Sequence, residues 1–217
     1  VTSLNVSNLS ISDLTGIENF ISVQYLYCQD NNLTTLDLSQ NIALIDLYAE
    51  RNQLTTLDVG NSNSLVWLFC FDNQLTNLNV SSNIILERLW CMNNQLTNLD
   101  VNNNTSLIEL RCSNNQLTNL NVSQNIALDM LKFGQNQLTN IDVSQNVFLT
   151  NLDCQFNQIL NLDISQNTIL NELNCRYNQL SSLDVSQDTA LSLLYCDGNQ
   201  LSALDLSNNT KLTTLWC

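Results

Sequence analysis

The chain contains neither histidine nor proline, and the missing histidine is the residue that serves most often as a general base or metal ligand. Lys and Arg are scarce: six of them stand against 20 Asp and Glu, which gives a formal net charge of −14. We therefore expect no nucleic-acid partner, because phosphate binding needs a basic surface. No apolar run approaches the ~20 residues of a membrane-spanning helix. Without an initiator Met or a cleavable signal stretch, the chain is expected to be a mature segment or a piece of a longer protein.

The sequence repeats with a period of 21 residues that does not slip. Each unit reads L-x-C-x-x-N-Q-L-T-x-L-D-V-S-x-N-x-x-L-x-x, and positions are numbered below from its first leucine. The nine units begin at Leu26, Leu47, Leu68, Leu89, Leu110, Leu131, Leu152, Leu173 and Leu194. We expect a single domain over 1–217, with a divergent N-terminal unit at 1–25, nine repeats at 26–214 and the start of a truncated tenth at 215–217.

Read from its last leucine, the unit becomes L-x-x-L-x-C-x-x-N-x-L, which resembles the leucine-rich repeat signature. It is similar to the short, 21-residue bacterial class with a nested second L-D-V/L element, over essentially the whole chain. The resemblance implies a curved, horseshoe-type solenoid with a parallel concave sheet and a ligand-binding role. Independently, L-T-x-L-D-V alternates with period 2, which indicates strand and not helix. We expect a mostly β solenoid with short second strands on the convex side and little or no helix.

All eight cysteines occupy the third position, and Ala49 and Phe133 take it in the two other units. Because Ala and Phe share only apolar character with Cys, we expect free thiols that pack in the core, with Cys217 as the exposed exception. Disulfides are an alternative, although neighbouring strands lie ~4.8 Å apart and bridged β-carbons ~3.8 Å. A zinc site is another, although a straight column of sulfurs does not surround a metal and no C-x-x-C occurs.

Two polar columns accompany the cysteines. One asparagine fills the sixth position of every unit, from Asn31 to Asn199, and we expect it to bond the turns above and below. The twelfth position holds Asp in seven units and Asn in two, namely Asp37, Asp58, Asn79, Asp100, Asn121, Asp142, Asp163, Asp184 and Asp205. These carboxylates are expected to bond neighbouring backbone or hydroxyl groups; clustered calcium binding is the alternative. We assign no metal site and no cofactor.

Functional residues are expected where the units differ, on the concave strands. Most aromatic residues and five of the six Lys and Arg lie there, although some bulky residues are needed on any sheet face for strand packing. We predict a partner-binding face made of Tyr27, Tyr48, Trp67, Phe69, Phe71, Arg88, Trp90, Met92, Arg111 and Lys132.

This face favours a non-enzymatic recognition or adhesion module that holds a protein partner, at a bacterial surface or outside the cell. The alternative is glycan binding, with the rings of the same face stacked on sugars. An enzyme is not expected, because no carboxylate pair stands out; Glu109, beside the basic residues, is the one residue we would test for catalysis. The last turn, Leu215-Trp216-Cys217, has no polar closing unit, so end-to-end self-association is a further expectation.

Overall fold

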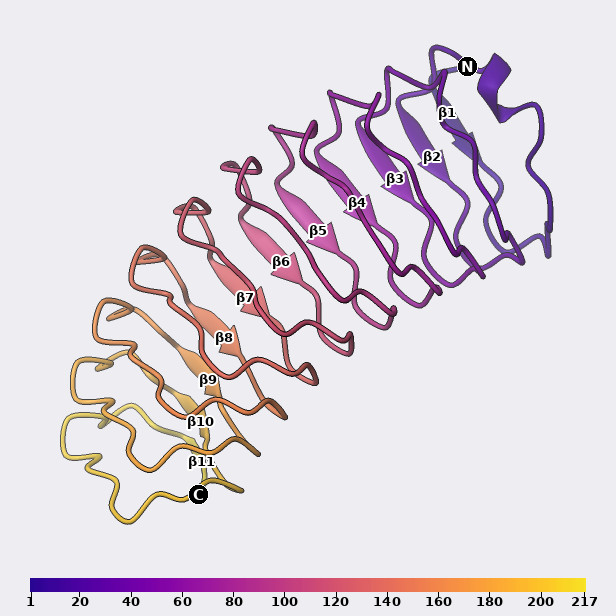
Figure 1. Cartoon of the computed structure of the whole chain (residues 1–217). Helices are drawn as coiled ribbons and strands as arrows, with labels where there is room; N and C mark the ends of the chain where they lie inside the picture. The colour runs from indigo at the N-terminus through magenta and orange to yellow at the C-terminus, as the bar shows by residue number, and fades with distance from the viewer.

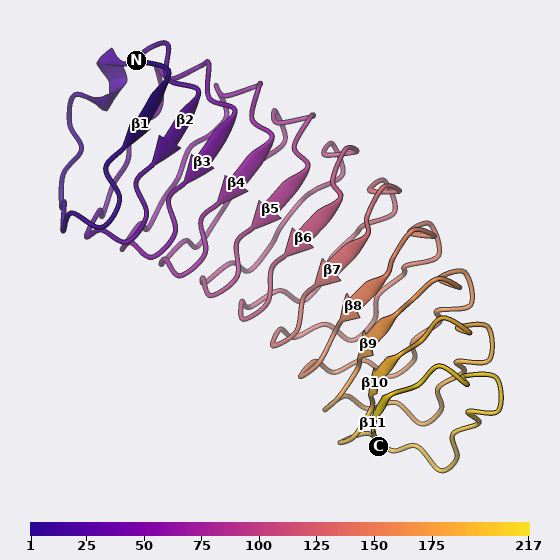
Figure 2. The ribbon, with the colours of Figure 1, turned by 180° about the vertical axis from the view of Figure 1, so that it is seen from behind.

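The computed structural model describes residues 1–217 as an elongated, gently curved solenoid with the two termini at opposite ends (Figure 1 and Figure 2). Eleven short strands form one parallel sheet in which each strand pairs with the next along the chain. They are β1 Ser3–Asn5, β2 Tyr25–Tyr27, β3 Asp46–Tyr48, β4 Trp67–Phe69, β5 Arg88–Trp90, β6 Glu109–Arg111, β7 Met130–Lys132, β8 Asn151–Asp153, β9 Glu172–Asn174, β10 Leu193–Tyr195 and β11 Thr214–Trp216. The one helical element is the 3-10 turn η1, Ile17–Asn19, and no helix could serve as a transmembrane span. The predicted fold class is confirmed.

Each strand from β2 to β10 has a buried centre flanked by two outward-facing residues, which follows from the period-2 alternation of side chains in a strand. The central leucine of every strand from β2 to β10 is fully buried. Strands pair in register, so that Leu26 lies beside Leu47 and Tyr27 beside Tyr48. Every position of the repeat therefore forms its own column of stacked side chains along the solenoid.

The convex side differs from the expectation in one respect. The only β-bridge there is a single parallel one between Asp58 and Asn79, so the expected second strands are not formed as a second sheet. Strand-like hydrogen bonding requires a spacing of about 4.8 Å between neighbouring chains. Because the sheet holds the turns at that spacing on the inner side of the curve, the outer side must follow a longer path, and its turns lie too far apart to pair.

The core is one cluster of 52 buried apolar residues that runs through the repeats. Seven of the eight cysteines belong to it, and all eight are free thiols, which confirms their predicted role as core residues. The thiol of Cys28 donates to the carbonyl of Tyr48 at 3.3 Å. Burial raises the pKa of Cys91 to about 12, so this thiol stays protonated and unreactive at neutral pH.

The asparagines of the sixth position hold the turns together as predicted. In the second repeat, Nδ2 of Asn52 donates to the carbonyls of Cys28 at 3.0 Å and Ala49 at 3.2 Å, while Oδ1 accepts the N–H of Leu33 at 3.0 Å. Asn115 makes the same hydrogen bonds three turns later, with Cys91, Cys112 and Leu96 as partners. Each side chain thus bonds backbone in its own turn and in the preceding one.

A second buried asparagine column, which was not predicted from the sequence, occupies the sixteenth position. Asn146 is typical: its Nδ2 donates to the carbonyls of Val122 at 3.0 Å and Asn125 at 2.9 Å. Asp188 takes this position in the eighth repeat and is 1% exposed, with neither carboxylate oxygen hydrogen-bonded to the protein. Burial, and to a lesser extent the nearby charge of Asp184, raises the pKa of Asp188 to about 7.

Candidate binding face

The second position of the repeat forms a row of side chains on the outer face of the sheet, because adjacent strands pair in register. We call its first four members, Tyr27, Tyr48, Phe69 and Trp90, the aromatic ladder. Tyr27 and Tyr48 stack with ring centroids 4.8 Å apart, Tyr48 meets Phe69 edge-on at 4.9 Å, and Phe69 stacks on Trp90 at 4.4 Å. These separations are those of favourable aromatic pairs, so the ladder is one continuous packed surface.

Three further predicted residues flank the ladder, and they differ in how much of them solvent can reach. The ring of Trp67 lies 6.4 Å from that of Phe69, and Phe71 lies 6.2 Å from Trp90. Phe69 and Phe71 are only 7% and 9% exposed, so they support the surface more than they form it. Trp67, Trp90 and Met92 remain partly exposed. A partner on this face would contact the tryptophans first.

The basic residues beside the ladder are held by rings and by a carboxylate. The guanidinium carbon of Arg111 lies 4.2 Å from the ring centroid of Trp90, and that of Arg88 lies 4.9 Å from Trp67. Glu109, whose side chain is 12% exposed, accepts from Nη2 of Arg111 at 2.5 Å and lies 3.8 Å from Nε of Arg88. The two arginines therefore present flat, stacked guanidinium groups whose charge Glu109 partly compensates.

The row continues past Arg111 with Lys132 and then Asp153, its register partner on β8. Burial is the main cause that raises the pKa of Asp153, while the charge of Lys132 opposes this rise and that of Glu172 adds to it. Polar groups thus replace rings in the middle of the sheet. This change marks the end of the aromatic surface.

A second, smaller group of rings and arginine lies near the C-terminal end, outside the predicted site. The guanidinium carbon of Arg176 lies 5.3 Å from the ring of Tyr195 and 5.4 Å from that of Trp216. Nη2 of Arg176 donates to Gln155 at 3.1 Å, and its Nε lies 3.8 Å from Asp197. The same signal that identifies the first site, a ring in the second position beside an Arg, also identifies this one.

The fifth position borders the face, and its backbone is left-handed in every complete repeat. The side chains there pair along the column: Arg51 lies 3.6 Å from both Asp30 and Asp72, and Phe156 stacks on Tyr177 at 4.3 Å. Asn and Asp tolerate this backbone region more readily than Phe or Tyr do. The stacking contact between the two rings gives a structural reason for aromatic residues at these two exposed positions.

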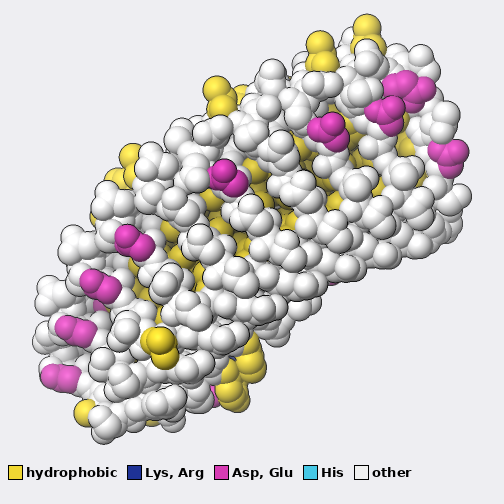
Figure 3. Space-filling model, viewed as in Figure 1, with side chains coloured by type: hydrophobic (Ala, Val, Ile, Leu, Met, Phe, Trp, Pro, Cys, Tyr) yellow, Lys and Arg dark blue, Asp and Glu magenta, His cyan; other side chains and the backbone are white.

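The aspartates of the twelfth position lie exposed along the convex face, where Figure 3 shows a series of acidic side chains. Each carboxylate accepts the N–H two residues later, as Asp37 does from Ser39 at 2.9 Å. Asn79 and Asn121 accept from Ser81 and Ser123 in the same way. The hydrogen bonds from Ser39 lower the pKa of Asp37. No group of three or more acidic or cysteine side chains lies close enough to hold a metal ion.

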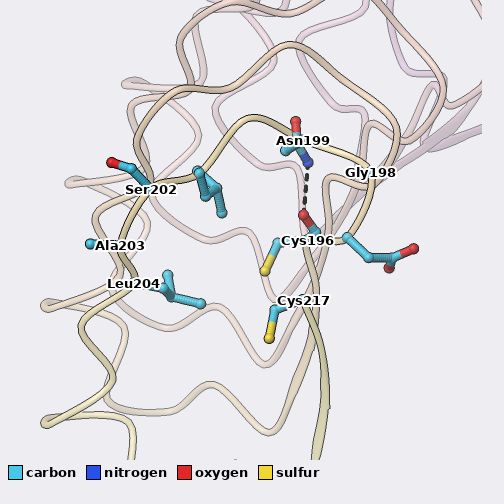
Figure 4. Close-up of a pocket in the computed structure, with 9 residues that line it drawn as sticks. Cys196, Gly198, Asn199, Ser202, Ala203, Leu204 and Cys217 are labelled. Atoms are coloured by element: carbon cyan, nitrogen blue, oxygen red, sulfur yellow. Dashed lines mark hydrogen bonds between the residues drawn. The ribbon is translucent and has the colours of Figure 1, made fainter.

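A hollow of about 240 Å³ opens beside the last turn, between the sulfur atoms of Cys196 and Cys217 and the side chain of Leu204 (Figure 4). Asn199 donates to the carbonyl of Cys196 at 2.9 Å on its rim. Cys196, Leu201, Leu204 and Cys217 belong to the columns that fill the core in earlier turns, so this part of the hollow continues the core. Trp216 is 55% exposed here. The self-association expected at this end stays a prediction.

No protein-family profile matches the chain. A stretch of 41 residues, 19% of the chain, is 56% identical to internalin J of Listeria monocytogenes, of which it covers 4%. The solved functional domain of that protein, described as including a cysteine ladder, has 39% identity and a TM-score of 0.85 over 99% of this chain and 53% of its own. The leucine-rich repeat protein LIC12759 of Leptospira interrogans has 26% identity and a TM-score of 0.87, over 98% of this chain and 58% of its own. A chain of the solved complex of LRIM1 and APL1C has 26% identity and a TM-score of 0.78, over 95% of this chain and 41% of its own.

The chain thus spans little more than half the length of the solved domains of internalin J and LIC12759. This chain has a cysteine column of its own, with seven free thiols buried in the core. The parallel sheet, the 21-residue turns and the near absence of helix agree with these relatives as well. The chain is a leucine-rich repeat protein of the short, 21-residue bacterial class, and its relatives indicate an interaction or adhesion module.

Proposed function

We propose that the chain is a non-enzymatic recognition module that binds a protein partner on its concave sheet, through the aromatic ladder and the adjoining residues Trp67, Arg88 and Arg111. The observation that supports this is the continuous packing from Tyr27 to Arg111, without a break between rings and guanidinium. Trp, Tyr and Arg are the residue types that dominate binding energy at protein interfaces. Five strand spacings of about 4.8 Å from Tyr27 to Lys132 give roughly 24 Å, close to the width of a standard interface.

The packing of the rings favours a protein over a glycan. Sugars stack on the faces of aromatic rings, but Tyr27 and Tyr48 cover one another, and so do Phe69 and Trp90. Arg111 lies over Trp90 as well. What the ladder offers a ligand is mainly ring edges, hydroxyl groups and guanidinium groups, which suit the mixed polar and apolar surface of a protein. A glycan remains the second candidate, since Trp67 and Trp90 lie on this face and remain partly exposed.

The complex of LRIM1 and APL1C among the relatives is consistent with a protein partner. We place the module outside the cell or at a bacterial surface, on the strength of its likeness to internalin J. Activity is not part of the proposal: Glu109 is tied to two guanidinium groups, an arrangement that suits an anchoring role.

The test uses the immobilised chain, its Trp90→Ala variant and a Leu160→Ala control, which removes an exposed apolar side chain on the convex side. Surface proteins of candidate host cells and a panel of soluble polysaccharides are passed over each, and retained species are identified and their affinities measured. A protein that binds at least tenfold more weakly to Trp90→Ala, and equally to the control, supports the proposal. Saturable polysaccharide binding lost in Trp90→Ala would favour the glycan instead, and ligands indifferent to Trp90 would refute the site.

A further inference from the structure

A row of apolar side chains lies in solvent along the edge of the solenoid that precedes the strands. It occupies the seventeenth and eighteenth positions of the repeat, immediately after the buried asparagine column. We call it the edge row: Ile42, Ile84, Ile85, Ile126, Val147 and Phe148, which are 44–60% exposed. Figure 3 shows hydrophobic side chains projecting along this edge. Polar residues interrupt the row in two turns, but exposed apolar side chains that recur along one edge in this way typically mark an interaction site.

The scaffold does not require apolar side chains at these two positions. Other repeats carry Asn63, Ser64, Thr105 and Ser106 there, and the backbone of the turn is unchanged: the N–H of Leu65 donates to Ser62 as that of Leu86 donates to Asn83. The buried columns on either side are complete with or without an outer Ile. The edge row is therefore not explained by packing within the chain.

Acidic residues border the edge row on both sides. Asp58, Asp100 and Asp142 are exposed at the twelfth position of their repeats. Figure 3 shows a series of acidic side chains that runs parallel to the hydrophobic side chains of the edge. Glu87 and Asp129, each placed just before a strand, lie on its sheet side. Between the twelfth and twentieth positions, no Lys or Arg occurs before Lys211 in the last repeat. The basic residues are gathered instead on the sheet.

We propose that the edge row binds a cationic amphipathic helix, with the apolar stripe of the helix on the Ile and Phe side chains and its Lys or Arg beside the flanking carboxylates. Five turns separate Ile42 from Val147, which is at least about 24 Å at the spacing of the sheet. A helix of 18 residues is about 27 Å long at a rise of 1.5 Å per residue. A second copy of the chain fits poorly, because two surfaces with these acidic borders, each on a chain of charge −14, repel one another. The proposal does not depend on the concave face.

The experiment measures the fluorescence anisotropy of a labelled 18-residue Leu/Lys amphipathic helix titrated with the folded chain. A peptide of the same composition, reordered so that it has no apolar stripe, separates docking from simple charge attraction. The double variant Ile126→Ser/Phe148→Ser is expected to weaken binding of the helix at least tenfold. Its matched control, Leu160→Ser, removes an exposed apolar side chain elsewhere on the convex side and is expected to leave binding unchanged.

A second variant tests the charged borders. Asp100→Asn/Asp142→Asn keeps the hydrogen bond of each position, because Asn79 and Asn121 already make it in their repeats. We expect weaker binding and a smaller dependence on salt. Equal binding of the reordered peptide, or unchanged affinity in Ile126→Ser/Phe148→Ser, would overturn the proposal and leave only non-specific attraction to an acidic chain. Loss of binding in Trp90→Ala would overturn it too, by moving the helix to the concave face.

Discussion

Replacing Asp188 with Asn should stabilise the protein, and more so as pH rises. Asp188 stands in the buried column whose asparagines each donate two hydrogen bonds to the preceding turn, as Asn167 does to Val143 at 3.1 Å and Asn146 at 2.8 Å. The Asp188 side chain is 1% exposed, and once ionised it has no proton to donate in a hydrogen bond. The variant Asp188→Asn restores the donor group and removes a buried charge.

The magnitude follows from the pKa of Asp188. Burial raises it from 3.8 to about 7, so the folded state holds the proton more tightly than the unfolded chain. Below pH 3.8 both states are protonated and the cost is absent. Between 3.8 and 7 only the unfolded chain loses its proton, so the wild type loses stability as pH rises, and above 7 the whole cost is present. That cost is about 4 kcal/mol at most, and the restored hydrogen bonds add about 1 kcal/mol each.

Urea denaturation of wild type and variant at pH 4 and pH 8, followed by circular dichroism, measures the difference. The midpoint should rise in Asp188→Asn by much more at pH 8 than at pH 4. The control is Asp37→Asn, because hydrogen bonds from Ser39 lower the pKa of this exposed carboxyl and Asp37 lies seven repeats away from Asp188, so removing its charge brings no such gain at high pH. A gain that does not vary with pH, or a loss at pH 8, would refute the argument from burial.

Three further outcomes follow from the columns. Asn115→Ala should cost about 2–4 kcal/mol in unfolding free energy, because it leaves the carbonyls of two turns and one N–H without partners; a cost below 1 kcal/mol by denaturation would contradict the role of this column. In the folded protein, a thiol reagent should modify Cys217 rapidly and the other seven cysteines only on unfolding. Fast reaction of more than one thiol without denaturant would contradict their burial. Gly198→Ala should destabilise the last turns by about 1–2 kcal/mol, since φ is +69° and an added β-carbon would lie 2.5 Å from the ring of Tyr177. Tyr177→Ala should remove part of that cost in the double variant, as a thermal melt would show, and an unchanged cost would place the strain in the backbone alone.

Much of the fold could be predicted from the sequence because the repeats allow each position to be compared across the nine units. Leu26 and its equivalents, and Cys28 with Ala49 at one position, identify inward-facing columns without any knowledge of the structure. The pairing on the convex side could not be predicted in this way. The bridge between Asp58 and Asn79 occurs in one repeat pair only, and the spacing of the turns on this side depends on the curvature of the solenoid. The period-2 alternation of apolar and polar residues predicts which way a side chain points, but it does not predict the spacing between turns.

The sequence predicted which way the side chains of the candidate site point, but not how deeply each of them is buried. Phe69 and Phe71 do point toward the sheet surface, but neighbouring large rings at one strand spacing cover each other, and both end up nearly buried. The charge of Arg111 is likewise reduced by Glu109, a residue that belongs to the same strand. Such pairings depend on rotamers, which a single sequence does not specify.

The two proposed surfaces differ in how their charges are compensated, and ionic strength separates them. On the sheet, Arg88 and Arg111 share Glu109 and lie over tryptophan rings, so a partner there meets little uncompensated charge. Along the edge row, Asp100 and Asp142 are exposed with no Lys or Arg beside them. Screening between exposed charges grows as the Debye length falls from about 10 Å at 0.1 M salt to about 3 Å at 1 M. Binding at the edge should therefore weaken steeply over this range while binding at the ladder changes little. Equal salt dependence of the two, measured on the same preparation with Trp90→Ala and Ile126→Ser/Phe148→Ser to assign each ligand, would mean that one surface serves both.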